Sequence, residues 1–390
     1  MDKKWQYRKI GDVCIVERGG SPRPIDQYIT DDENGINWIK IGDTTESMFI
    51  TETVQKIKPE GMRKSRYVQP GDFLLSNSMS FGRPYILKID GCIHDGWLVL
   101  RDKDGLFDKR FLYYYLSAKT TYQKFKGMAV GGVVNNLNSE MVRKIDVPIP
   151  SKVEQAEIAD LLDKLNVVIV MRQKELQKLD DLIKARFVEM FGDPIKNPKG
   201  WEVVTIGDIV KEVKYGTSKP AVEGGKYPYL RMNNLTPDGH LDLNDLKYID
   251  ISEDEIEKCV VRKGDVLFNR TNSIELVGKT AVFDLPDDMV IAGYIIRVRL
   301  NERMLPEVLS QYMNLEALKD ILRSMAKGAV NQANINAQEL QNVKVYLPDM
   351  GLQKKFIEMK EQVDKSKVEV QKALDETQKL FDSLMQQYFG

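Results

Sequence analysis

Polar side chains suited to binding a nucleic acid gather in loop-like segments of both halves of this sequence. Asn and Gln pair bidentately with adenine edges and Arg with guanine, while Ser, Thr, Lys and glycine-rich backbone bind phosphates. The candidates in the first half are Arg23, Asn77, Ser78, Ser80, Arg83, Asn135, Asn136 and Asn138. Those in the second half are Lys219, Arg231, Asn269, Arg270, Asn272, Lys279, Asn331, Gln332, Asn334 and Asn336. Asn, Gly and Ser also serve ordinary turns, so turn chemistry is the alternative for each of them.

Motifs that carry out catalysis are mostly absent. Residues 273–280, SIELVGKT, approach the pattern of a phosphate-binding loop, but Ser273 replaces the first glycine, which lets the loop backbone wrap phosphate. No methyltransferase-like glycine loop with an Asn/Asp-Pro-Pro-aromatic tetrad occurs either. We therefore predict no catalytic residue, and we expect that the chain alone does not bind S-adenosylmethionine or another cofactor.

Composition narrows the class of protein further. The 57 Lys and Arg residues are balanced by 58 Asp and Glu, giving a formal net charge of −1. A surface that binds nucleic acid must therefore be local or completed by partners. Cys14, Cys92 and Cys259 lack metal-binding spacing and indicate reduced core thiols, and His94 and His240 are too few to suggest a zinc site. No metal site is predicted.

No targeting segment is visible at the start of the sequence. The first residues, MDKKWQYRKIGD, lack the apolar stretch of a signal peptide. No apolar run approaches the roughly 18 residues of a membrane span. We expect a cytoplasmic protein without membrane segments.

The chain repeats itself with an offset close to 195 residues. Trp5 returns as Trp201, VQPGDFLLSNS returns as VRKGDVLFNRT, and Pro150 returns as Pro348, always in the same order. The small changes in offset are those that loop insertions would cause. The sequence therefore predicts one unit used twice, with the polar loops as its most divergent parts.

Each unit ends in a stretch with the apolar spacing of a long helix. From Lys152 to Phe191, apolar residues recur in alternating steps of four and three, which is typical of a helix packed lengthwise on another. Forty helical residues would make a rod of about 60 Å. The predicted seam is Ile158, Leu162, Leu165, Ile169, Leu176, Leu179 and Ile183, and its copy is Phe356, Val363, Val370, Leu374, Phe381 and Leu384. Lys360 and Lys367 make the copied seam more polar than the first.

The part of each unit before its helix mixes short strand-like runs with helical spacing. Apolar or alternating runs such as residues 73–76 and 97–100 predict strands, and residues 109–125 have helical periodicity. The fold class predicted is α/β, with two repeated α/β domains joined by two long helices that pair antiparallel.

At this point the sequence resembles a known family, the specificity (S) subunit of Type I restriction–modification systems. The resemblance covers the whole chain. It rests on the two-unit plan, on GGSPRP and VQPGDFLLSNS, on VRKGDVLFNRT, and on LDDLIKARFVEMFGDP at the end of the first long helix. It implies target recognition domains at residues 1–150 and 193–349, with spacer helices at 151–192 and 350–390 forming an antiparallel coiled coil.

The same resemblance implies a function and partners. Each domain is expected to read one half of a bipartite, asymmetric site in double-stranded DNA. The chain is expected to be non-catalytic and to recruit two methyltransferase (M) subunits, which modify adenine with S-adenosylmethionine, and optionally endonuclease or translocase (R) subunits. We expect the M subunits to dock on helical surfaces outside the seams, including Glu154-Gln155 and their counterparts Leu352-Gln353. The alternatives are a coiled-coil scaffold with two domains that bind proteins or peptides, and a self-sufficient enzyme.

Overall fold

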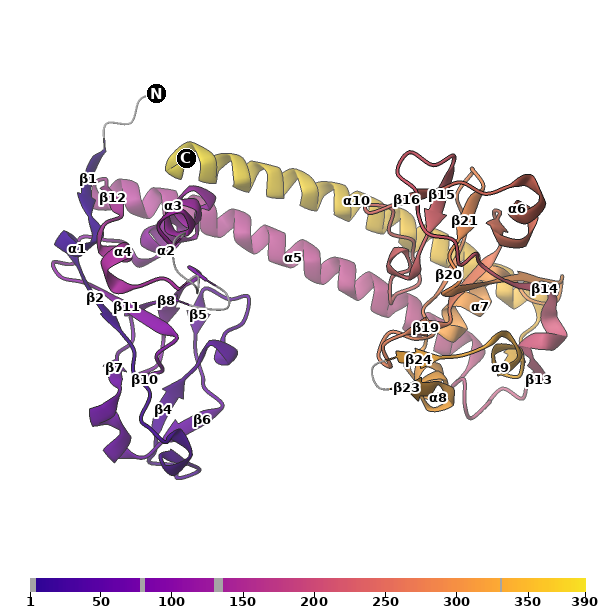
Figure 1. Cartoon of the computed structure of the whole chain (residues 1–390), viewed down its shortest axis with the longest axis horizontal. Helices are drawn as coiled ribbons and strands as arrows, with labels where there is room; N and C mark the ends of the chain where they lie inside the picture. The colour runs from indigo at the N-terminus through magenta and orange to yellow at the C-terminus, as the bar shows by residue number, and fades with distance from the viewer. Residues whose placement is uncertain (1–4, 78–80, 130–135, 330–331) are drawn as a thin grey trace. The chain divides into compact units, whose positions relative to one another are not determined.

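The computed structural model describes residues 5–77, 81–129, 136–329 and 332–390. The chain divides into two compact units (Figure 1). Unit 1 contains Met1–Gln173 and Lys372–Gly390, and unit 2 contains Lys174–Gln371. Each unit therefore includes a part of both long helices, α5 (Lys152–Phe191) and α10 (Met350–Phe389).

Unit 1 contains two mixed sheets and a small strand pair. The strands are β1 (Gln6–Lys9), β2 (Cys14–Arg18), β3 (Ile29–Thr30), β4 (Ile36–Ile39), β5 (Phe49–Ile50), β6 (Gln55–Ile57), β7 (Arg66–Val68), β8 (Phe73–Ser76), β9 (Pro84–Leu87), β10 (Gly91–Ile93), β11 (Trp97–Asp102) and β12 (Asp146–Ile149). The helices that precede α5 are α1 (Ile10–Val13), α2 (Lys109–Ser117), α3 (Lys119–Ala129) and α4 (Ser139–Arg143). The strand orders are β2-β11-β8-β9-β5, β3-β6-β4-β10-β7 and β1-β12.

The central strands of unit 1 are buried on both faces, which explains their continuous apolar runs. In β8, Leu74 packs with Trp97 and Ile93 between the two five-stranded sheets. Its neighbours Phe73 and Leu75 point to the other face, because side chains alternate along a strand, and they join the cluster formed with the helices.

Unit 2 repeats this plan. Its strands are β13 (Glu202–Thr205), β14 (Val210–Tyr215), β15 (Tyr227–Leu230), β16 (Lys247–Ile249), β17 (Val260–Val261), β18 (Val266–Asn269), β19 (Thr271–Asn272), β20 (Thr280–Val282), β21 (Met289–Ile291), β22 (Ile295–Leu300), β23 (Lys327–Ala329), β24 (Gln332–Asn334) and β25 (Lys344–Leu347). Its helices besides the long ones are α6 (Glu253–Cys259), α7 (Pro306–Met313), α8 (Glu316–Met325) and α9 (Ala337–Gln341). The strand orders are β14-β22-β18-β20, β16-β15-β21-β17, β13-β25 and β19-β24-β23.

The central strands of the two units correspond in order, although, among the described residues, unit 1 has two five-stranded sheets and unit 2 has two four-stranded sheets and an additional three-stranded sheet. The central β2-β11-β8-β9 of unit 1 corresponds to β14-β22-β18-β20 of unit 2, and the parallel pair β4/β10 corresponds to β15/β21. The predicted repeat of a mixed α/β unit with a long helix is thereby confirmed.

The long helices bury the predicted seam within each unit. Every seam residue is buried or half-buried. In unit 2 the ring centroids of Phe187 and Phe356 lie 5.2 Å apart, and Lys367 donates to Asp180, so the two helical segments run antiparallel there. Phe187, which the alternating pattern did not select, is only 1% exposed. None of the described helices has an 18-residue window apolar enough for a membrane span.

The expectation that Gln155 and Gln353 lie on an exposed docking surface is wrong, because both side chains are fully buried. Gln155 accepts a hydrogen bond from the Asp108 backbone N–H at the start of α2 and donates to two carbonyls. Gln353 likewise accepts from Leu305 N–H at the start of α7. The repeated glutamine therefore ties each long helix to the domain that precedes it.

Candidate nucleic-acid interface

The loops with the polar candidates start from the same backbone positions in the two units. Asn77 N–H donates to Gly96 O in unit 1, and Arg270 N–H donates to Tyr294 O in unit 2, both at 2.9 Å. The carbonyl oxygens of Asn77 and Arg270 accept from Leu137 N–H and Ile335 N–H, at 3.0 and 2.9 Å. Asn77 and Arg270 are therefore structurally equivalent, and different side chains occupy one position of the scaffold.

A glycine in each unit lets a second loop approach this position. A Cβ atom on Gly19 would lie 2.1 Å from His94 O, and one on Gly216 would lie 2.2 Å from Ile291 O. The close backbone approach requires glycine, since any larger residue would push the loops apart. The equivalent loops at residues 18–23 and 215–219 are thereby held beside the loops at 94–96 and 292–294.

In unit 2 these loops surround a cavity of about 580 Å³. Three basic candidates line it, namely Lys219, Arg231 and Arg270, together with the aromatic residues Tyr229 and Tyr294. Basic and aromatic side chains in one concave surface suit the phosphates and π-faces of a nucleic acid. The structure thus brings together residues that lie up to 75 positions apart in the sequence, Lys219 and Tyr294.

In unit 1 the equivalent loops converge on a carboxylate. Ser21 Oγ donates to Asp95 Oδ1 at 2.7 Å, and Arg23 forms an ion pair of 3.7 Å with the same side chain. The hydrogen bond from Ser21 is the largest cause that lowers the pKa of Asp95, so this loop presents an anionic group. Asn77 donates to the Asp95 carbonyl at 2.8 Å. Unit 1 therefore has a carboxylate, paired with Arg23, where the equivalent loop of unit 2 has Gly293.

Three of the predicted binding residues are enclosed in the domains and are left out of the interface. Asn77 and Asn269 are 2% and 0% exposed, and their amides bond to backbone carbonyls. Lys279, which is 5% exposed, donates to the carbonyls of Met232 and Leu235, and burial lowers its pKa. These buried side chains donate hydrogen bonds to backbone carbonyls and so stabilise the loops from inside the domain.

Two further candidates are N-caps, as turn chemistry predicts. Asn138 accepts from Met141 N–H at the start of α4, and Asn336 accepts from Gln338 and Glu339 N–H at the start of α9. Asn272 and Asn334 are half-buried, with side-chain hydrogen bonds to Asn269 and Thr271.

The remaining candidates are exposed or fall outside the described residues. Arg23, Arg83, Asn136, Lys219 and Gln332 are exposed, and Arg231 and Arg270 are half-buried. Ser78, Ser80, Asn135 and Asn331 lie outside the residues that the structure describes.

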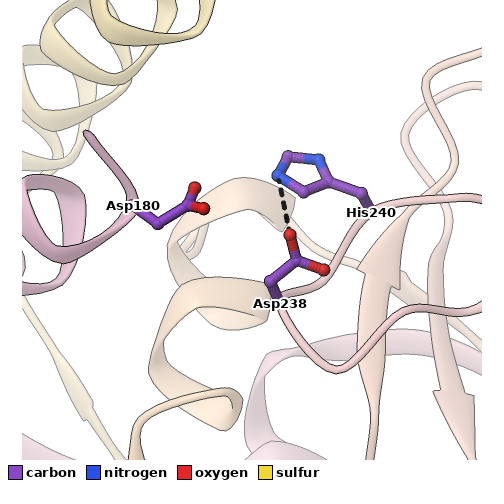
Figure 2. A group of neighbouring side chains, drawn as sticks. All are labelled: Asp180, Asp238 and His240. Atoms are coloured by element: carbon purple, nitrogen blue, oxygen red, sulfur yellow. Dashed lines mark ion pairs between the residues drawn. The ribbon is translucent and has the colours of Figure 1, made fainter. Parts of the chain in front are cut away.

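One polar cluster of unit 2 did not emerge from the sequence. Figure 2 shows Asp180 from α5 beside Asp238 and His240 from a loop, with one ligand atom of each within 4.8 Å of the others. Lys367 of α10 donates to Asp180, and its Nζ lies 3.4 Å from His240 Nε2. Because the lysine ammonium already supplies the positive charge, we interpret the cluster as an ionic bridge that fixes this loop on the helices. The sequence signal that could have pointed to this cluster is Lys367, a charged residue at a position of the predicted helix seam.

Comparison with known proteins adds family information. The model of a family described as Type I restriction modification DNA specificity domain matches residues 2–180 and 198–378. Among curated relatives, the specificity subunit of the Type I restriction enzyme EcoKI from Escherichia coli K12 is 22% identical, over 89% of this chain and 78% of its own length. The MjaIX specificity subunit from Methanocaldococcus jannaschii is 28% identical, over 60% of this chain and 58% of its own length.

Two solved structures share the fold. The Type I restriction–modification S subunit from M. genitalium has a TM-score of 0.55 at 16% identity, covering all of this chain and 97% of that one. A chain from a study of complex assembly in a type I R-M system has a TM-score of 0.62 at 18% identity, covering all of this chain and 98% of its own.

Proposed function

The chain belongs to the Type I restriction modification DNA specificity family, and on this premise we propose that it is the DNA-reading subunit of a Type I restriction–modification complex. It is non-catalytic, as the specificity subunits of this family are. The observation that carries the proposal is the equivalence of Asn77 and Arg270. One scaffold is used twice, and the side chain at its loop position is changed. This combination suits two domains that read different sequences, because Arg270 lines the cavity of unit 2 whereas Asn77 is enclosed in unit 1.

We further propose how the work is divided between this chain and its partners. Each unit contacts one half of a bipartite site, and methyltransferase subunits supply the S-adenosylmethionine and the chemistry at adenine. A pair of such subunits fits the twofold repetition of the chain. The half-sites differ because equivalent loop positions carry different side chains. Unit 1 has Asp95 where unit 2 has Gly293, and it has Asn77 where unit 2 has Arg270.

DNA binding by the chain assembled with its methyltransferase subunits tests this function. We expect the affinity for the recognised duplex to fall steeply as salt rises, since each neutralised phosphate releases counterions. Methylated adenines mapped in cells with and without the gene should identify one asymmetric, bipartite sequence that loses its methylation with the gene. Binding without salt dependence, or unchanged methylation, would instead favour the protein-binding scaffold.

We propose that the methyltransferase subunits dock on an exposed apolar stripe of α5 in unit 1. Val167, Val170 and Met171 are 51%, 38% and 63% exposed, and their spacing of three and four places them on one helix face. Exposed apolar side chains at this spacing suit the apolar face of a partner helix. The stripe replaces the buried Gln155 and Gln353 as the expected docking surface.

Changing Met171 to Asp tests the docking stripe. The variant should lose assembly with methyltransferase subunits in size-exclusion chromatography, because a carboxylate would be desolvated in the interface. Its melting temperature should stay unchanged, since the side chain is exposed in this chain alone. Leu161→Asp adds the same charge at another exposed position of α5, which is not three or four residues from any residue of the stripe, and it should assemble normally. Normal assembly of Met171→Asp would place the docking surface elsewhere.

A further inference from the structure

Building on the proposed function, we infer that Arg270 reads a guanine in the half of the DNA site that unit 2 contacts. A guanidinium can donate two hydrogen bonds to the O6 and N7 atoms of guanine in the major groove, which is the commonest specific contact between a side chain and a base. The position, partners and orientation of Arg270 distinguish it from the other basic residues of this unit.

The first observation is the charge of Arg270, which no carboxylate among the described residues of unit 2 balances. Of the eight arginines between residues 174 and 371, seven form ion pairs with Asp or Glu. These seven are Arg186, Arg231, Arg262, Arg297, Arg299, Arg303 and Arg323. In the described part of unit 2, Arg270 has no such partner, although it lines the cavity.

The neighbouring basic residues of the cavity are engaged locally. Arg231 Nη2 contacts Asp245 Oδ2 at 2.7 Å, and Lys219 pairs with Glu255. Their charges are therefore partly neutralised by unit 2 itself. Arg270 is the cavity residue whose cationic group stays available for a ligand.

The second observation is that Arg270 is held in place. Its guanidinium carbon lies 5.0 Å from the centroid of the Tyr215 ring, and the Tyr215 hydroxyl accepts a hydrogen bond from Ala337 N–H at 2.8 Å. Nη1 is 3.5 Å from Gly293 O, and Nε is buried without a hydrogen-bond partner among the described residues. A guanidinium that already packs on an aromatic ring loses little conformational entropy when it binds. Its coplanar N–H donors then match two acceptors on the edge of a base.

The third observation is the difference between the two units. A residue that contacts phosphate can stay the same in both units, because the DNA backbone is the same at every sequence. A residue that reads a base must change when the half-site changes. At this position the backbone hydrogen bonds are retained, while the side chain changes from Asn77, which is enclosed in unit 1, to Arg270, which lines the cavity of unit 2.

The test is Arg270→Asn in the full chain assembled with methyltransferase subunits, with binding measured over a DNA library that covers the whole site. The substitution is matched to the scaffold, because unit 1 already accommodates asparagine at this position. We expect the preference for guanine to fall about tenfold to a hundredfold at one base pair of one half-site. The other half-site, read by unit 1, should keep its preferences.

The second variant is Arg270→Lys. Lysine keeps the positive charge but lacks the two coplanar N–H donors of a guanidinium. If Arg270 reads guanine, this variant should have a weaker preference at the same base pair, because an ammonium can also donate to O6 and N7 but lacks the planar geometry of the guanidinium. Preferences that stay unchanged in both variants, or affinity that falls equally for all sequences, would overturn the inference. The proposed function itself fails only if the parent complex shows no sequence preference, so the two failures are distinct.

Discussion

Replacing Leu162 by Asp is expected to unfold unit 1. Leu162 is 0% exposed, and it belongs to the cluster that joins α5 to α2 and to the end of α10. Removing a buried leucine side chain costs about 2–5 kcal/mol, and a carboxylate without a partner in the same place adds several more. The sum is comparable to the whole stability of a typical domain, which is about 5–15 kcal/mol.

Leu161→Asp is the matched control for this substitution. Leu161 precedes Leu162 on the same helix but is 37% exposed, so we expect its replacement to change the free energy of unfolding by about 0.5 kcal/mol at most. Denaturant unfolding followed by circular dichroism measures both variants. A Leu162→Asp chain that unfolds at the parent's denaturant midpoint would show that the predicted seam does not hold unit 1 together.

The repeat and the long helices were predictable because their signals are periodic. The apolar spacing of α5 persists over 40 residues, and landmarks such as Trp5 and Trp201 keep their order in both halves. A single misplaced residue hardly changes such a pattern. The helix bounds, Lys152 and Phe191, consequently agree with the structure.

The roles of single polar residues could not be predicted in the same way. Asn77 and Arg270 both occur in polar loop segments, yet one amide bonds inside the domain and the other side chain lines a cavity. Gln155 looked like an exposed helix residue, but the turn that leads into α2 folds over it. Such outcomes depend on which backbone groups come close in the fold, and local composition contains no information on that.

The cavity of unit 2 could not be predicted from the sequence for the same reason. Lys219, Arg270 and Tyr294 belong to three separate loops, and close backbone approach at Gly216 helps to bring these loops together. The basic residues could be named from the sequence. Only the fold shows that, among the described residues, Arg270 is the one basic side chain of the cavity without a carboxylate partner.

Exchange of unit 1 is expected to change half of the recognised DNA sequence and leave the other half intact. The structure indicates that helical segments must be exchanged together with the domain. Arg110 of α2 contacts Asp160 and Asp163 of α5 at 2.6 and 2.8 Å, and Thr120 of α3 donates to Phe389 O at the end of α10. We therefore expect the best chimera to take residues 1–173 and 372–390 from a relative.

A chimera cut at residue 150 is the comparison. In this chimera a foreign α2 would face Asp160 and Asp163 of the original α5. The hydrogen bonds of Gln155, which accepts from Asp108 N–H and donates to Leu106 O, would also be disturbed. We expect this second chimera to melt at a lower temperature, because it leaves buried polar groups unpaired at about 1–3 kcal/mol each. Methylation mapping of both chimeras with methyltransferase subunits measures the recognised sequence. If both halves of the site change together, the reading loops of unit 1 and unit 2 do not act independently, and the modular interpretation is wrong.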